Sequence, residues 1–343
     1  MALAALRFWS LSRRSTVAFL RCSLAHSSPS QRSLEESVLS AVEANRYQQL
    51  PELLDSSKEF GRNPNPFAFL SRFTESHRLH VVDGILQSLI CVRPRERSRG
   101  VYNFLLSYAL ESSTPIPLAL AILQRMLRSG HRPVSQTHLL LSNAWIERLQ
   151  KLRSVSSVLS EMHSIGYSPD SGTCNYLIMS LCKVDRLEEA IKVLRGMSKG
   201  GCIPDLDSYG VLIGGMSELR MTTEVLEMVK EMVKKHGMNP RQDTMVKAFG
   251  AMRANRDIWR SVEMIEFLEG EDVYIGFEAY ESVLEGCLEG HHFVLAGKLV
   301  IKMTERGLIP YIKERQRVYE GLVGVGELEL ANIVRKKFAE LKS

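Results

Sequence analysis

Apolar residues in the middle of this chain recur at intervals of three and four positions, in pairs of segments joined by short polar turns. Within residues 171–205, the first apolar segment covers residues 176–182. The second is formed by Leu187, Ala190, Ile191, Val193, Leu194 and Met197. This spacing places apolar side chains on one face of a helix. It predicts two helices joined at Asp185 and Arg186 and ended by Gly201 and Pro204.

The end of the second helix carries a motif that repeats along the chain, Met-x-x-x-Gly followed closely by Pro, with one further residue before the glycine in the copy at Met232. The five copies begin at Met126, Met162, Met197, Met232 and Met303. The steps between them are 36, 35, 35 and 71 residues, and Leu268 stands where a degenerate sixth copy would have its methionine. Neither helix of such a unit can bury its apolar face alone, so the period predicts an all-α solenoid of stacked helix-turn-helix units.

The clearest unit resembles the pentatricopeptide repeat (PPR) family. The residues that carry the resemblance are Thr173, Asn175, Leu177, Ile178, Leu187, Glu188, Glu189, Ala190, Met197, Gly201, Pro204 and Asp205. The tetratricopeptide repeat fits less well, because no unit begins with its Trp-x2-Leu-Gly-x2-Tyr pattern. The PPR resemblance implies a right-handed superhelix of 35-residue repeats, a P-class member without a catalytic domain, and an organelle of a plant cell.

The repeat pattern gives an expected domain organisation. We expect degenerate helical repeats over residues 33–98 and capping helices of repeat type over residues 312–343. Between them, over residues 99–311, we expect six repeats, at 99–134, 135–170, 171–205, 206–241, 242–276 and 277–311.

Residues 1–32 differ from the rest of the chain. The first 34 residues contain five arginines and no Asp, Glu or Lys, and serine is frequent. This composition predicts a cleaved, disordered transit peptide, for the mitochondrion rather than the alternative, the chloroplast. The five arginines account for the whole formal charge of +5, so residues 35–343 sum to zero. Any attraction to a phosphate backbone must then come from local patches. The strongest candidate is the loop that contains Arg93, Arg95, Arg97 and Arg99.

The resemblance also implies single-stranded RNA binding at about one base per repeat, read by the fifth and last residues of each repeat. In the clearest repeat these residues are Asn175 and Asp205, a pair that favours uracil in the family. Lys183 matches a lysine that meets phosphate, but Gly172 replaces the usual aliphatic residue that packs on the base. The other pairs are Asn103 with Val134, Leu139 or Leu140 with Asp170, Gly210 with Arg241, Val246 with Gly276, and Glu281 with Tyr311.

Those other pairs are not recognisable base-reading pairs, and the phosphate position of other units holds Glu75, Glu111, Glu218, Ala254 and Glu289. Carboxylates there repel an RNA backbone, so we expect a largely degenerate reading surface. Asn103 and the four arginines remain candidates for non-specific RNA contact. The cysteines and histidines show no metal-ligand spacing, and no motif indicates an enzyme, a cofactor, a membrane span or a small-molecule substrate.

Two functions from different classes follow. The first is an RNA-binding protein of mitochondrial RNA metabolism, acting in transcript processing, stability or translation. The alternative is a structural PPR protein, such as a component of the mitochondrial ribosome that contacts ribosomal RNA or ribosomal proteins without reading sequence.

Overall fold

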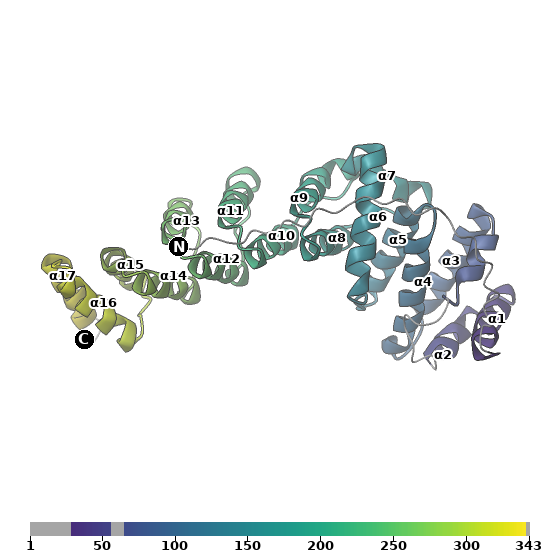
Figure 1. The fold of residues 1–343 in the computed structure, drawn as a ribbon, viewed down its shortest axis with the longest axis horizontal. Helices are drawn as coiled ribbons and strands as arrows, with labels where there is room; N and C mark the ends of the chain where they lie inside the picture. Colours follow the sequence, from purple (N-terminus) through teal and green to yellow (C-terminus); the bar gives the residue numbers. More distant parts are fainter. Residues whose placement is uncertain (1–28, 56–64, 341–343) are drawn as a thin grey trace, which may run out of the picture.

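The computed structural model describes residues 29–55 and 65–340 and shows an elongated stack of helices (Figure 1). Most of the predicted transit peptide lies outside these residues, and α1 begins at Pro29. The N-terminal part consists of α1 (Pro29–Glu43), η1 (Tyr47–Gln49), α2 (Leu50–Asp55), η2 (Ala68–Arg72), α3 (Glu75–Leu89) and η3 (Arg95–Ser98). Here α3 is followed by the short 3-10 turn η3 rather than by a second long helix.

From Arg99 onward the helices form pairs. These are α4 (Arg99–Glu111) with α5 (Pro115–Arg128), α6 (Gln136–Leu152) with α7 (Val155–Ser164), α8 (Ser171–Lys183) with α9 (Leu187–Gly196), α10 (Leu206–Glu218) with α11 (Thr222–His236), α12 (Gln242–Ala254) with α13 (Ile258–Gly270), α14 (Phe277–Glu289) with α15 (Phe293–Glu305), and α16 (Ile312–Gly324) with α17 (Leu328–Glu340). A single 3-10 turn, η4 (Ser198–Gly200), follows α9. The described residues are all helical or loop, as the sequence predicts.

The helix pairs form two layers. Helices α8, α10, α12 and α14 contact one another in turn, and α9, α11 and α13 line the other side of the stack (Figure 1). One apolar core runs between the layers from Val38 to Val334, and Trp145 is fully buried in it. Each pair therefore buries its apolar faces against its neighbours, which is how a solenoid is stabilised.

The repeated Met-x-x-x-Gly motif closes the second helix of each pair. The five methionines are at most 1% exposed, so they pack in the core. The glycine adopts a left-handed conformation, with φ of 84° at Gly201. This turn brings the amide of the residue after the glycine back to the carbonyl of the methionine. Cys202 N donates to Met197 O at 3.0 Å, and Tyr167 N donates to Met162 O at 2.9 Å. That is the hydrogen bond of a Schellman motif, which satisfies a carbonyl at the helix end.

The degenerate copy has the same backbone with different side chains. Leu268 is fully buried at the methionine position. Asp272 stands where the glycine would be and takes the left-handed conformation itself, with φ of 54°. Val273 N donates to Leu268 O at 2.9 Å, as in the other copies. The turn thus survives the loss of its glycine, because aspartate tolerates this region better than most residues.

Candidate nucleic-acid interface

The last residue of a unit has a structural role before any binding role. Asp170 and Asp205 are the N-cap residues of α8 and α10. Asp205 Oδ1 accepts from Ser208 N at 2.8 Å, and Ser208 Oγ accepts from Asp205 N at 3.1 Å, which completes a capping box. Aspartate at this position is therefore explained in part by the need to satisfy free amides at a helix start.

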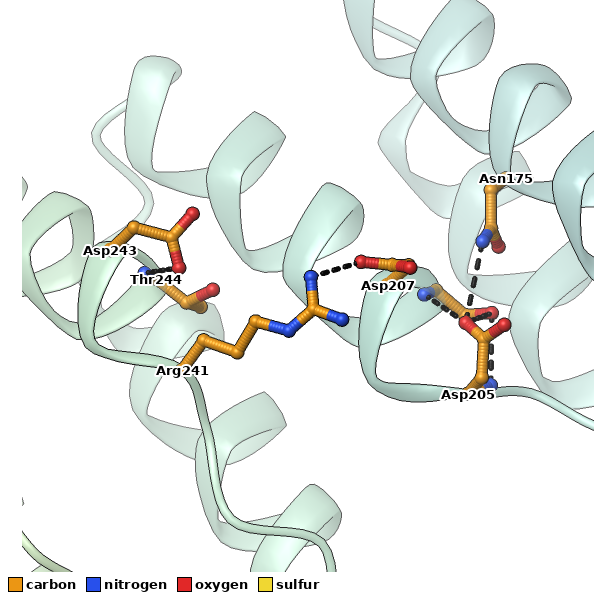
Figure 2. A network of polar contacts seen from close by, with 7 residues as sticks. Asn175, Asp205, Asp207, Arg241, Asp243 and Thr244 are labelled. Atoms are coloured by element: carbon orange, nitrogen blue, oxygen red, sulfur yellow. Dashed lines mark hydrogen bonds and ion pairs between the residues drawn. The ribbon is translucent and has the colours of Figure 1, made fainter.

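Asn175 and Asp205, predicted as the base-reading pair, do lie together (Figure 2). Asn175 Nδ2, on α8, donates to Asp205 Oδ1 at 3.3 Å, and both residues are half-buried. Asn175 Oδ1 is buried and has no hydrogen-bond partner. Burial opposes ionisation of Asp205, but hydrogen bonds from Ser208, Ser171 and Asn175 together hold the pKa of its carboxyl below the usual value. The pair thus offers a carboxylate and an amide side by side.

Lys183, predicted to meet phosphate, is engaged within the protein. Its Nζ donates to Glu218 Oε2 at 2.6 Å, and both side chains remain substantially exposed. Glu218 is the residue at the same position of the next unit, so the cation and the carboxylate neutralise each other. Arg253 likewise forms ion pairs with Glu285 and Glu289 of α14. This face therefore carries charge in pairs rather than as a continuous basic track.

A groove beside Asn175 and Asp205 runs across α8, α10 and α12. Its volume is about 330 Å³, and Gly210 and Gly214 lie in its lining with no side chain to fill it. Arg241, which lies in the lining as well, forms an ion pair with Asp207 (Figure 2). Lys183, Glu218, Asp243 and Lys247 complete the charged lining. The groove is thus lined by charged side chains of both signs and by glycines.

The unit that ends at Tyr311 has an acidic first helix. Burial and the neighbouring carboxylates of Glu285, Glu314 and Glu278 raise the pKa of Glu281, which stands at the base-reading position of α14. Burial is the larger cause of this shift, and the three neighbouring carboxylates add negative charge around Glu281. Phosphate is therefore disfavoured along this part of the stack.

The four arginines before and at the start of α4 are all exposed. Arg95 and Arg97 belong to η3, and Arg99 begins α4. Arg93 donates to the carbonyls of Ile90 and Val92 at 2.9 and 2.8 Å. Within the described part of the chain, none of the four forms an ion pair with a carboxylate. This segment is the strongest unpaired basic patch that the sequence predicted.

Asn103 lies in a different environment from Asn175. It is 7% exposed among the buried residues of α4, and its Oδ1 has no hydrogen-bond partner. The structure thus places this predicted contact residue inside the helical layer, largely covered by its neighbours. The fifth position of a unit is not equally open along the stack.

Sequence reasoning missed ion pairs that join different helices and loops of the stack. Arg128 bonds to Asp170 at 2.8 Å, and Arg241 bonds to Asp207. The Lys183–Glu218 pair was detectable, because equivalent positions of adjacent repeats must lie close together. The other two join non-equivalent positions, so only the geometry reveals them.

No group of three or more His, Cys, Asp or Glu side chains that could hold a metal ion occurs in residues 29–55 and 65–340. The cysteines of this region are free thiols, and four of the five are buried. None of the helices described is long and apolar enough to cross a membrane.

Comparison with known proteins decides the family. A pentatricopeptide repeat-containing protein of Arabidopsis thaliana, At1g06270, is 53% identical over 310 residues, which cover 90% of each chain. The chain belongs to the pentatricopeptide repeat family. Models of the PPR repeat family and of the PPR repeat match residues 169–218 and 207–236. The first match covers the unit that contains Asn175, Lys183 and Asp205, and the second falls on the unit that follows it.

More distant PPR relatives share shorter parts of the chain. The small ribosomal subunit protein mL104 (rPPR9) of Arabidopsis thaliana is 28% identical over 119 residues, or 34% of this chain and 23% of that protein. The crystal structure of PPR10 in complex with an 18-nt psaJ RNA element aligns with 91% of this chain and 54% of that chain, at 16% identity and a TM-score of 0.35.

Proposed function

We propose that this PPR protein binds single-stranded organellar RNA with low base selectivity and acts in mitochondrial RNA metabolism. The observation that carries the proposal is the Asn175–Asp205 pair. A carboxylate and an amide 3.3 Å apart present an acceptor and donors to the edge of one base, near a groove that has glycines in its lining. The Arg-rich segment before α4 supplies phosphate contacts that do not depend on sequence.

Selectivity is low because only one unit has a recognised pair. One good base-edge contact discriminates against a wrong base by about 1 to 3 kcal/mol. The paired charges at Lys183–Glu218 and Arg253–Glu289 further reduce attraction to the backbone. The protein would therefore select a short uracil-containing site rather than one long unique sequence. An organellar address is supported by the arginine-rich start of the sequence and by relatives whose names place them in mitochondria or chloroplasts.

A second candidate function is that of a structural component of the mitochondrial ribosome. The observation that favours it is that two of the similar proteins carry the names of small ribosomal subunit proteins, mL104 and mL103. The ion-paired surface fits this role too, since a protein held by ribosomal RNA shape needs no base-reading residues.

Sedimentation separates the two functions. Mitochondria are lysed in about 0.5 M salt, a concentration at which weak phosphate contacts are largely lost. The lysate is resolved on a gradient and the full-length protein is detected by antibody. Migration near the top, with bound RNA fragments recovered by crosslinking, supports the RNA-binding role. Migration with one ribosomal subunit, in constant ratio to its proteins, contradicts it and supports the structural role.

A further inference from the structure

Each helix pair from α8 to α15 provides a cleft that receives the next helix. Helix α12 contacts both α10 and α11, α14 contacts both α12 and α13, and α16 contacts both α14 and α15. The equivalent cleft between α16 and α17 is not covered by any helix of the described chain. It has a volume of about 440 Å³, and Ile312, Tyr319 and Phe338 are among its lining residues.

This end of the stack is unusually apolar for an exposed surface. Seven of the fourteen large apolar side chains that are exposed in the described chain lie between Ile309 and Ile333. Ile312, in the cleft itself, is 74% exposed. Of these seven side chains, Ile312 is the one that lines the cleft, and an exposed apolar side chain in a cleft favours coverage by another molecule.

The charges that line the cleft have one sign. Arg315 and Arg335 belong to the lining, and no carboxylate does. The Arg315 guanidinium lies 5.3 Å from the centre of the Phe338 ring, and its buried Nε has no hydrogen-bond partner. Within the described residues Arg335 forms no ion pair. An occupant with carboxylates near its apolar face would satisfy both arginines.

A further cation on α17 stands where two earlier units hold one that pairs with the next second helix, which is a contact separate from the cleft between α16 and α17. Arg195 and Lys230 each lie 24 residues after the start of their unit's first helix, and each bonds to a carboxylate of the next second helix. These contacts are Arg195 to Glu231 at 2.8 Å and Lys230 to Glu263 at 2.9 Å. Lys336 has the same position in the α16–α17 unit and is exposed.

We propose that the cleft between α16 and α17 binds an acidic amphipathic helix of a partner protein, placed as the first helix of a further repeat would be. The apolar face of that helix covers Ile312 and Tyr319, and its carboxylates pair with Arg315 and Arg335. This mode is a helix laid in an apolar groove. It does not depend on whether the protein binds RNA.

Two other occupants fit less well. Single-stranded RNA would need open aromatic faces for its bases, but the Arg315 guanidinium already lies over the Phe338 ring. A second copy would have to present an acidic helix such as α1. The apolar side chains of α1, Val38, Ala41 and Val42, are buried in its own fold and cannot cover the cleft.

The test is fluorescence anisotropy with the full-length protein and a labelled helical peptide. The probe has the sequence of α14, residues 277–289, with Cys287→Ser and an internal lactam bridge. This segment contains four glutamates and no basic residue, and it fills the α12–α13 cleft within the chain. We expect saturable binding that weakens at least tenfold in the double variant Arg315→Glu with Arg335→Glu. A peptide with lysine at the four glutamate positions should bind the double variant more tightly than it binds the wild-type protein.

The matched control is Lys313→Glu with Arg317→Glu, which makes the same change of charge on α16 outside the cleft lining and should leave binding unchanged. Circular dichroism confirms folding. If the double variant does not fold, Ile312→Asp replaces it and should also abolish binding. The proposal is overturned by absence of saturable binding to the wild-type protein, or by equal weakening in the control. It is also overturned if Ile312→Asp abolishes self-association in sedimentation equilibrium, or if single-stranded RNA displaces the peptide from the cleft.

Discussion

Lys183 Nζ lies 2.6 Å from Glu218 Oε2, although the two residues occupy the same position of adjacent units. In a solenoid that tracks RNA through a row of lysines, that position carries one positive charge per unit. Here Lys183 is followed by a glutamate at that position of the next unit, and the two side chains form an ion pair within the protein. The pair is exposed, so it contributes little to stability, less than about 1 kcal/mol. The main effect of the pair is to neutralise the positive charge that Lys183 would otherwise present to an RNA backbone.

Glu218→Gln should therefore strengthen RNA binding. The substitution releases Lys183 to contact phosphate, and one added contact steepens the salt dependence of binding to single strands by about 0.7 in log–log slope. We expect affinity for a uracil-rich oligonucleotide to rise a few-fold at about 0.1 M salt, with little change in thermal stability. The matched control is Glu227→Gln, which removes the same charge from α11 in the other layer, where Glu227 pairs with Lys230. A gain of equal size in both variants would contradict the role assigned to Lys183.

Asp205→Ala should affect stability and RNA binding together, whereas Asp170→Ala should affect stability alone. Each aspartate caps a helix, so each substitution should cost about 1 kcal/mol. Only Asp205 has an asparagine beside it at the reading position. Thermal unfolding and anisotropy with a uracil-rich oligonucleotide measure the two effects. Equal losses of RNA affinity in the two variants would show that the aspartates act only through the fold.

The left-handed turns give a stability test of the repeat motif itself. Gly201→Ala should destabilise the protein by about 1 to 2 kcal/mol, because the Cβ of alanine makes the left-handed backbone conformation unfavourable. No atom lies within 4 Å of the added methyl group, so strain rather than collision is responsible. Asp272→Gly should stabilise the protein, raising the free energy of unfolding by about 0.5 to 1 kcal/mol. Denaturant midpoints measure both, and destabilisation by Asp272→Gly would contradict the assignment of Asp272 to the glycine position.

Acid should weaken the stack at Glu269. Burial opposes ionisation of Glu269, but hydrogen bonds from Lys302 and Tyr280 and the charge of Arg306 together lower its pKa below the ordinary value of 4.5. A lowered folded-state pKa gives stability that is present above pH 4.5 and is lost as the pH falls through the folded value. Glu269→Gln should therefore lower the unfolding temperature at pH 7, by an amount equivalent to about 1 to 3 kcal/mol. Near pH 3 the two proteins should converge, and a constant difference across this range would refute the ionic contribution.

The repeating architecture could be predicted from the sequence because the same residue pattern occurs in successive units. The buried methionine and the left-handed glycine of residues 197–201 are local requirements, and local requirements leave a sequence signal. Asp272 shows where this signal fails, since the backbone turn persists without its usual residue.

The candidate site was less predictable, because its state depends on contacts between units. The sequence predicts Asn175 and Asp205 as a pair and Lys183 as a phosphate contact. It does not reveal that Arg128 is paired with Asp170 or that Arg241 is held by Asp207. Asn103 and Asn175 have the same residue type at the same repeat position, yet Asn103 is buried and Asn175 is half-buried. Packing around each unit, which no single motif encodes, makes the difference.

The central claim is that one repeat reads one base and the rest of the stack reads none. Its most direct test is the affinity of the full-length protein for short single-stranded RNAs that differ only in one uracil, replaced in turn by each other base. We predict that the RNA with uracil binds about tenfold, and less than a hundredfold, more tightly than the other three RNAs. This ratio lies within the 1 to 3 kcal/mol of one base contact. The preference should disappear when Asn175→Ala and Asp205→Ala are combined. Discrimination of a thousandfold or more for one defined sequence, or equal affinity of the wild-type protein for all four RNAs, would contradict the account.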